Sequence, residues 1–391
     1  MVSPRLAGLR PSGRSFLPAV LVLIVIVAAS CVIPHEMGQV TPTPTCASSS
    51  NSSSQGLTWY SPTEVRDAKL NRAWCETVAP PVVKTSPDGP FRPWQAGDDL
   101  VVVAWNVYVG GGDLLDFLRE ELGLDCTGSR PRMRPSSMPF VLLLQETYRR
   151  ASFLLPVDEG PLIPWRIEPN PRPGAELDIE DAAHRCGLAL VYVPSARNGH
   201  DLEGIPPEDK GNAILSTVPL SDLVAIELPF EAGRKVAVGA TVRAPNGADL
   251  RVVSVHLDVS STLYRTLITG NGTRLRQVSG LTDVLTDLPE EGSFAATVVG
   301  GDFNTWSVRE SALVHMQQHF PESPRDALGT RGEFPTDHIF LVRDETRGLE
   351  MVPGSYRLVE DSHLSDHKAR EIRIRTIAAA TPPRDSVSSR R

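Results

Sequence analysis

The chain has 391 residues, of which 41% are hydrophobic and 22% are charged, and its formal net charge is −8. This length and apolar content are sufficient for one large globular domain or two small ones. The negative net charge and the absence of a long basic run argue against a protein that binds nucleic acid by charge alone. The composition still allows an acidic enzyme that handles phosphodiesters through a metal ion and a few arginines.

The first thirty residues are typical of an export signal. Three arginines precede an apolar stretch over residues 16–29, and small residues follow it. That stretch is short for a membrane span, which needs about twenty residues. Residues 27–31, Val-Ala-Ala-Ser-Cys, resemble the lipobox of bacterial lipoproteins, which predicts lipid attachment at Cys31. Plain signal-peptidase cleavage and an uncleaved anchor are the alternatives. We therefore expect a protein of the bacterial cell envelope, or a secreted one.

Composition divides the rest of the chain. Residues 1–30 are the predicted signal peptide, and residues 31–56 are rich in Ser, Thr and Pro, which predicts a linker. Residues 57–97 predict an N-terminal extension that packs on the main domain. Residues 98–377 alternate strand-like and helix-like segments and predict one α/β catalytic domain. Residues 378–391 predict a disordered tail.

Five cysteines are an odd number for an exported protein. If Cys31 carries lipid, the other four can form two disulfides in any of three pairings, and these four are Cys46, Cys75, Cys126 and Cys186. None of the four has the close spacing of a zinc site, so we predict structural thiols.

Apolar runs of strand length recur along the main domain. They cover residues 100–105, 140–144, 187–193, 213–216, 236–242, 251–255, 296–299 and 338–342, with short candidates at 356–359 and 372–374. Leucines at helical spacing predict helices over residues 113–122 and 273–288. Residues 156–185 are rich in proline and acids and show no period, which predicts a surface loop.

Polar residues capable of chemistry lie at the ends of these runs. They are Asn106, Glu146, His256, Asp302, Asn304, Asp337 and His367. Each one alone could be a turn, cap or core residue, but active sites form where several strand ends converge. Asp302 and Asn304 are two residues apart, so we expect both side chains on the same side of an extended segment.

The order of the surrounding motifs resembles the endonuclease/exonuclease/phosphatase superfamily over residues 101–374. The motifs are Trp105-Asn106, Gln145-Glu146, Gly211-Asn-Ala-Ile-Leu-Ser216, His256-Leu-Asp258, Gly301-Asp-Phe-Asn304, Asp337-His-Ile-Phe340 and Ser365-Asp-His367. The resemblance implies an α/β fold, a four-layer α/β sandwich in which two packed mixed β-sheets are flanked by helices.

The resemblance also implies roles for the individual residues. Glu146, assisted by Asn106, would bind a catalytic Mg²⁺, with Mn²⁺ or Ca²⁺ as alternatives, because such hard cations prefer oxygen ligands. His367 and Asp337 would form a histidine–carboxylate dyad. Asp302 would orient or deprotonate the attacking water, and Asn304 would stabilise the transition state. The remaining matches are His256 at the scissile phosphate, and Tyr192 and Arg234 as weaker phosphate contacts.

The leading hypothesis is an exported Mg²⁺-dependent phosphodiesterase that hydrolyses nucleic acid. A sphingomyelinase-like phospholipid phosphodiesterase and a catalytically inactive binding module are the alternatives. The sequence shows no cluster of aromatic residues suited to entering a lipid surface. Val107-Tyr108 departs from the family pattern, in which many relatives place Arg or Asp. His315 and His319 are expected on an exposed helix face, and His363 in a solvated loop.

Overall fold

The computed structural model describes residues 36–40, 56–150, 152, 154, 157, 160–169, 177–259, 272–287 and 294–377. The predicted signal peptide, Cys31 and the predicted tail at 378–391 lie outside these residues. Within them, no helix has both the length and the apolar character to cross a membrane.

The first of two large sheets has seven strands. In order across the sheet they are β1 (Met37–Val40), β2 (Leu57–Pro62), β10 (Ser221–Glu227), β11 (Val236–Arg243), β12 (Asp249–His256), β13 (Ala296–Asp302) and β14 (Asp337–Arg343). β2 runs parallel to β10, and β12 runs parallel to β13, whereas the other pairs are antiparallel.

The second large sheet has eight strands. In order they are β15 (Leu349–Met351), β17 (Arg370–Thr376), β4 (Asp99–Asn106), β7 (Phe140–Arg150), β9 (Glu208–Ser216), β8 (Ala189–Arg197) and β3 (Val82–Lys84), with β16 (Arg357–Leu358) paired to β17. β4 and β7 are parallel, and the other pairs are antiparallel. Two short strands, β5 (Leu124–Asp125) and β6 (Arg132–Met133), form a separate ribbon.

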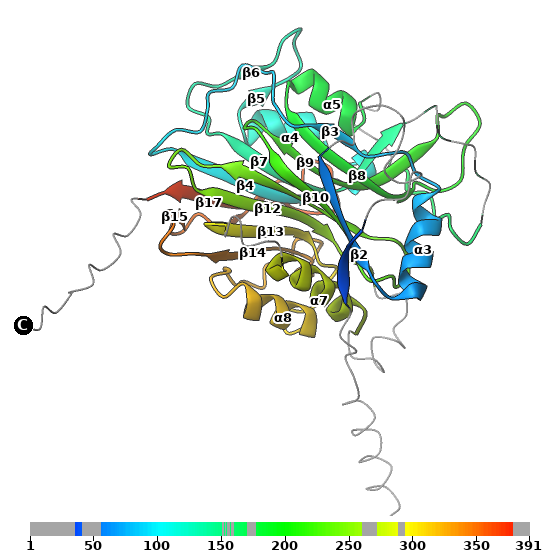
Figure 1. Cartoon of the computed structure of the whole chain (residues 1–391). Coiled ribbons are helices and arrows are strands. Elements are labelled where there is room, and N and C mark those ends of the chain that lie inside the picture. Colours follow the sequence, from blue (N-terminus) through cyan, green and yellow to red (C-terminus); the bar gives the residue numbers. More distant parts are fainter. Residues whose placement is uncertain are drawn as a thin grey trace, which may run out of the picture.

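The helices lie outside the two sheets and complete four layers (Figure 1). α4 (Leu114–Glu120) and α5 (Ile179–Cys186) cover the outer face of the eight-stranded sheet, and α7 (Gly272–Asp287) and α8 (Ser311–His319) cover the seven-stranded one. The largest core cluster consists of aliphatic residues from both sheets and fills the space between them. The predicted fold class, a four-layer α/β sandwich with two mixed sheets, is confirmed.

The segment before the main domain contributes strands to both sheets. β2 lies between β1 and β10 in the seven-stranded sheet, β3 is an edge strand of the eight-stranded sheet, and α3 (Val65–Cys75) lies between them in sequence. Residues 57–97 are therefore part of the sandwich as well as an extension that packs on it. Four residues within the predicted linker, those of β1, pair with β2 as an edge strand.

One helix lies where a loop was expected. α5 begins after Asp178, whose carboxylate accepts hydrogen bonds from the backbone N–H groups of Glu180 and Asp181 and so caps the helix. Gly187 ends it in the left-handed conformation. The proline-rich sequence before Asp178 hides this short helix, whose cap and terminal glycine are its clearest sequence signals.

A disulfide joins Cys126 to Cys186 and ties the β5–β6 ribbon to the end of α5. This bond belongs to one of the three pairings that the sequence left open, and Cys46 lies outside the described residues. Cys75 at the end of α3 is disulfide-bonded as well.

Candidate active site

The strand register brings the predicted polar residues to one end of the sandwich. In the seven-stranded sheet His256 is paired with Asp302, and Asp302 with Asp337. In the eight-stranded sheet Asn106 ends β4 beside Gln145, one residue before Glu146. Because β4 and β7 are parallel, as are β12 and β13, their carboxyl ends meet at the same edge of each sheet.

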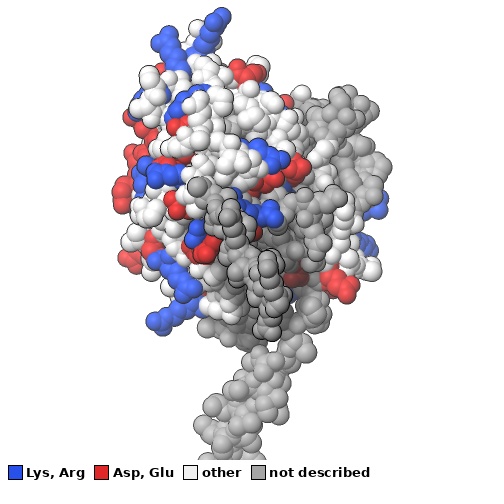
Figure 2. Space-filling view, turned by 60° about the vertical axis from the view of Figure 1, so that its left-hand side comes forward, with Lys and Arg blue, Asp and Glu red and all other residues white. Residues whose placement is uncertain are grey.

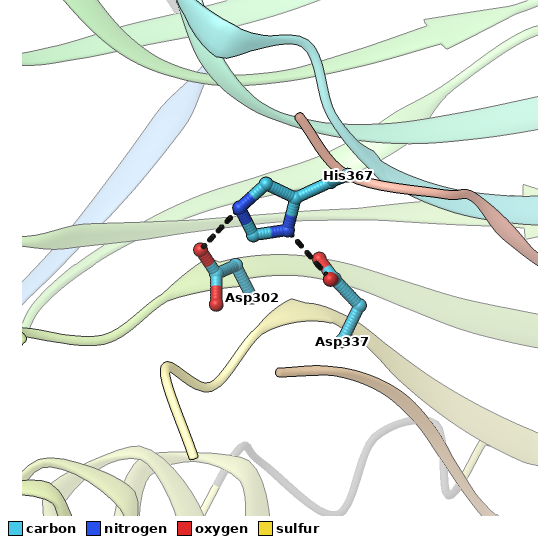
Figure 3. Close-up of side chains that lie close together, drawn as sticks. All are labelled: Asp302, Asp337 and His367. Carbon is cyan, nitrogen blue, oxygen red and sulfur yellow. Dashed lines mark hydrogen bonds and ion pairs between the residues drawn. The ribbon is translucent and has the colours of Figure 1, made fainter. Parts of the chain in front are cut away.

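Three buried side chains form a chain of contacts across the gap between the sheets. His367 lies between Asp337 and Asp302, and each of its ring nitrogens faces one carboxylate (Figure 3). The Nδ1 atom is 2.7 Å from Oδ2 of Asp337, and the Nε2 atom is 3.8 Å from Oδ2 of Asp302. Thr336 donates a second hydrogen bond to Oδ2 of Asp337 at 2.8 Å. The Asp337 carboxylate, itself held by Thr336, fixes the orientation of the His367 imidazole, as in a histidine–carboxylate dyad.

Asp302 is the centre of the cluster. Its Oδ2 atom accepts a hydrogen bond from Nδ2 of Asn106 at 3.0 Å and lies 3.6 Å from Nε2 of His256. Its Oδ1 atom accepts the backbone N–H of Asn304 at 2.7 Å. Asn106 comes from one sheet and His256 from the other, so Asp302 links the two halves of the site.

The electrostatics follow from this packing. Burial alone would lower the pKa of His367, but the carboxylates of Asp337 and Asp302 outweigh it and raise that pKa to about 10. The imidazole is therefore a cation at neutral pH. Burial, together with the charge of Asp337, raises the pKa of Asp302 to about 7. Burial and the surrounding cations lower the pKa of His256 well below its usual value, so His256 is neutral.

Two residues of the site have strained backbones. Glu146 has φ of 52° and lies where the register between β7 and β9 shifts, and Asn304 also has φ of 52°. This left-handed conformation is unfavourable for Glu146, whereas asparagine is one of the residues that tolerate it. The expectation that Asn304 continues an extended segment beside Asp302 was wrong. β13 ends at Asp302, and the turn that follows directs the Asn304 amide to the carbonyl oxygen of Leu257, 2.8 Å away.

Oxygen atoms suited to a hard cation gather beside this cluster. The Glu146 carboxylate lies 3.9 Å from Nε2 of His256, and its charge also acts on Asp366. Asp366 has a buried Oδ1 atom with no hydrogen-bond partner among the described residues. Carboxylate oxygens and the Asn106 amide oxygen are a ligand set that Mg²⁺, Mn²⁺ or Ca²⁺ accepts. The donor set around Glu146 therefore fits a divalent cation.

A second group of potential ligands overlaps the first. Ligand atoms of Asp302, Asp337 and His367 all lie within 4.8 Å of one another, close enough to hold an ion. The carboxylates of Asp337 and Asp302 raise the pKa of His367, which favours a protonated imidazole without a free lone pair when no ion is bound. Asp337 and His367 therefore fit the histidine–carboxylate dyad that the resemblance implies, and Asn106 and Glu146 remain the predicted ligands of a cation.

Three cationic side chains surround the cluster, and the sequence did not single them out. The positive charges of Lys235, Lys210 and Arg331 all act on His256. Arg331 forms an ion pair with Asp366 at 2.7 Å. Lys210 is influenced by the carboxylate of Glu146, and burial lowers its pKa. Lys210 directly precedes the Gly211-Asn212 motif, and that proximity is the only signal by which sequence could have found it.

The two weaker phosphate contacts are engaged elsewhere. The hydroxyl of Tyr192 donates to Asp209 at 2.9 Å, in a buried network with Arg149. The Arg234 guanidinium is fully buried and forms an ion pair with Glu227 at 2.7 Å. Their contacts give both residues a structural role in linking strands, and their match to phosphate-binding positions receives no support.

His363 is not a solvated loop residue, as was expected. It is 4% exposed, and its Nδ1 atom lies 2.9 Å from Oδ2 of Asp116 in α4. Its ring contacts Phe117 and Trp105 edge-on. His363 thus fastens the loop that carries Asp366 and His367 to the outer helix. On α8, His319 is exposed, as was expected. His315 is only partly exposed, because its ring is hydrogen-bonded to Thr282 of α7.

No protein-family model matches the sequence, and no curated protein matches it either. Solved structures do match. One is an endonuclease/exonuclease/phosphatase from Beutenbergia cavernae, 17% identical, with a TM-score of 0.46 and 72% of each chain covered. Another is the human Nocturnin catalytic domain with bound sulfate, 16% identical, with a TM-score of 0.48, covering 73% of this chain and all of that one.

A third match is sphingomyelinase C from Streptomyces griseocarneus, 14% identical, with a TM-score of 0.38, covering 70% of this chain and 99% of that one. The first of the three carries the name of the superfamily that the sequence motifs resemble. At these identities and TM-scores, the roles of individual residues rest on the geometry described above.

Proposed function

We propose that the chain is a divalent-metal-dependent phosphodiesterase that acts on nucleic acid, with Mg²⁺ as its expected ion. The observation that carries the proposal is the joint cluster in which Asp302 contacts Asn106, His256 and His367 at once. It combines a buried carboxylate, an imidazolium held by Asp337, and an adjacent set of oxygen ligands. That combination suits hydrolysis of a phosphodiester by water.

Each residue of the site has a proposed role that follows from its position. The imidazolium of His367 and the side chain of His256 flank Asp302 and would face the phosphate oxygens, where negative charge accumulates in the transition state. Asp302 would orient the attacking water and accept its proton, because its carboxylate is held in place by Asn106 and the Asn304 backbone. A cation at Glu146 would neutralise charge on a phosphate or leaving oxygen.

Polynucleotides are the favoured substrate because of the local charge. On the face shown in Figure 2, Lys/Arg and Asp/Glu residues are interspersed and form no large patch of one sign. Beside the acidic residues of the site, Lys210, Lys235 and Arg331 add positive charge that acts on His256, and Arg331 is paired with Asp366. A polyanion gains from such a group at several phosphates. Sphingomyelin offers only one phosphate, whose charge is balanced by the neighbouring choline, so it gains less from these cations.

Sphingomyelin hydrolysis remains the second candidate because of one observation. Trp306 and Phe334 form an exposed ring pair beside the cluster, the kind of feature that could enter a lipid surface.

We also propose export as a lipoprotein or secreted protein. Disulfide bonds at Cys75 and between Cys126 and Cys186 support an oxidising compartment.

A substrate panel tests the proposal. Purified full-length protein is assayed on plasmid DNA, single-stranded DNA, RNA, sphingomyelin vesicles and bis-p-nitrophenyl phosphate, with Mg²⁺, Mn²⁺, Ca²⁺ or EDTA. We expect cleavage of polynucleotides that EDTA abolishes. Asp302→Asn and His367→Ala should each lower kcat by about two to three orders of magnitude. Normal turnover by either folded variant would contradict the mechanism, and inactivity on every substrate would favour a binding module.

The lysines provide a separate control on substrate class. Lys210→Gln should weaken polynucleotide binding and reduce the dependence of log affinity on log salt concentration by about one unit, as expected for one lost phosphate contact. Its turnover of bis-p-nitrophenyl phosphate should change far less. An unchanged salt dependence would remove the charge argument for nucleic acid.

A further inference from the structure

Two aromatic side chains are exposed beside the catalytic cluster. Trp306 is 51% exposed and Phe334 is 50% exposed, and their ring centroids are 5.9 Å apart at an angle of 42°. Neighbouring rings in the same region, those of Phe303 and Phe340, are buried. The pair is therefore a departure from the local pattern of burial, and half of each large apolar side chain faces solvent.

Hydrogen bonds hold the backbone at both ring-bearing positions. The N–H of Trp306 donates to Oε1 of Glu310 at 2.7 Å, and Glu310 is itself held by a buried ion pair with Arg274. Phe334 lies on a tight turn, in which its N–H donates to the carbonyl oxygen of Arg331 at 3.1 Å. The N–H of Thr330 in turn donates to the carbonyl oxygen of Phe334 at 3.0 Å. The two rings thus form a preorganised surface.

The ring pair adjoins the reacting groups on both of its segments. Trp306 follows Asn304 by two residues, and Phe334 precedes Asp337 by three. The N–H of Phe303 donates to the carbonyl oxygen of Thr336 at 2.8 Å, which joins the two segments directly. Arg331, on the same turn as Phe334, pairs with Asp366 beside His367. A ligand on the rings would therefore lie next to a phosphate bound at the cluster.

We propose that Trp306 and Phe334 are a stacking platform for a nucleobase of the polynucleotide, adjacent to the scissile phosphate. The inference rests on the proposed function and specifies how that substrate is held. A nucleobase is favoured over a lipid surface because the two rings form one small platform beside the proposed phosphate site, and Lys210 and Lys235 add positive charge near that site. Stacking on aromatic rings accepts every base, so the platform provides affinity and register with little sequence preference.

The experiment compares oligonucleotides that differ by one base. A short single-stranded DNA is prepared intact, and with a tetrahydrofuran abasic residue on one or the other side of the cleaved phosphodiester. For the wild-type protein, we expect one of the two abasic substitutions to raise KM about ten- to hundred-fold, the range for stacking of one base on an aromatic side chain. The kcat value should change little.

The variants test whether the two rings cause this difference. Trp306→Leu and Phe334→Leu should raise KM for the intact strand and remove most of the penalty for the abasic one. Trp306→Phe and Phe334→Tyr keep an aromatic ring and should retain most of the penalty. Both side chains are half exposed, so the thermal unfolding temperature of the variants should stay close to that of the wild type.

The outcomes separate the platform from the proposed function. Polynucleotide cleavage with an abasic penalty that Trp306→Leu and Phe334→Leu leave intact would overturn the platform alone. A protein that cleaves no polynucleotide would overturn both proposals. If that protein also hydrolysed sphingomyelin and sedimented with sphingomyelin vesicles more strongly than Trp306→Leu, the ring pair would be a lipid contact instead.

Discussion

His338 makes the stability of the fold depend on pH. Its side chain is 8% exposed, and its Nε2 atom lies 2.8 Å from the carbonyl oxygen of Pro335 and 3.1 Å from Oγ1 of Thr305. Burial lowers the pKa of His338 from 6.5 to about 4. Among the nearby charges, Arg370 lowers this pKa further, whereas those of Asp337 and Asp326 oppose the shift.

The folded protein therefore keeps His338 neutral, whereas the unfolded chain binds a proton near pH 6.5. The contribution of this pKa difference to the free energy of unfolding is fully present above pH 6.5 and is lost as pH falls toward 4. A shift of one pKa unit corresponds to about 1.36 kcal/mol, so the shift to about 4 gives a loss of about 3 kcal/mol at pH 4.

Urea unfolding between about pH 4 and pH 8 measures this effect. Other groups also titrate in that range, so the informative quantity is the difference in unfolding free energy between wild type and His338→Gln. Glutamine can still donate to the Pro335 carbonyl but does not titrate. The wild type should lose about 3 kcal/mol relative to the variant between about pH 7.5 and pH 4. A difference independent of pH would refute the reasoning.

Other predictions concern covalent and steric constraints and the metal ligands. Cys126→Ser should destabilise the fold by about 4 kcal/mol, because the bond to Cys186 closes a loop with a sequence separation of 60; urea unfolding of the oxidised proteins measures this, and an unchanged midpoint would contradict it. Gly301→Ala should yield little folded protein, because a Cβ atom there would lie 1.9 Å from the Val255 carbonyl oxygen; soluble, active Gly301→Ala would show that the strands can separate. Glu146→Gln should weaken Mn²⁺ binding at least about ten-fold in calorimetric titration without loss of folding, and unchanged affinity would place the ion elsewhere.

Much of the sandwich could be predicted from the sequence. The buried strands β4, β7, β12 and β13 are continuous apolar runs, and burial on both faces produces that pattern. β3 was not predicted because it is an edge strand of three residues, and β2 and β10 were not predicted because polar residues interrupt or flank their short apolar runs. Helix α5 was not predicted because its eight residues are too few for a helical period of apolar residues to be recognised.

For the site, the order of motifs predicted several residues that the fold brings together, but it could not supply their contacts. Asp302, Asp337 and His367 end or flank strands, so the register brings them together. The ring pair could not be predicted, because Trp306 and Phe334 lie 28 positions apart and meet only through the fold. The same is true of Lys210, whose neighbour Glu146 is on another strand.

The residues of the candidate site are divided between the two sheets. Asn106, Glu146 and His367 belong to one sheet or its loops, and His256, Asp302 and Asp337 to the other. Neither sheet alone holds the complete set, so under the proposed function a chain whose two sheets have not yet packed together could not hydrolyse a phosphodiester. During refolding, the onset of the proposed activity would therefore report when the two sheets dock.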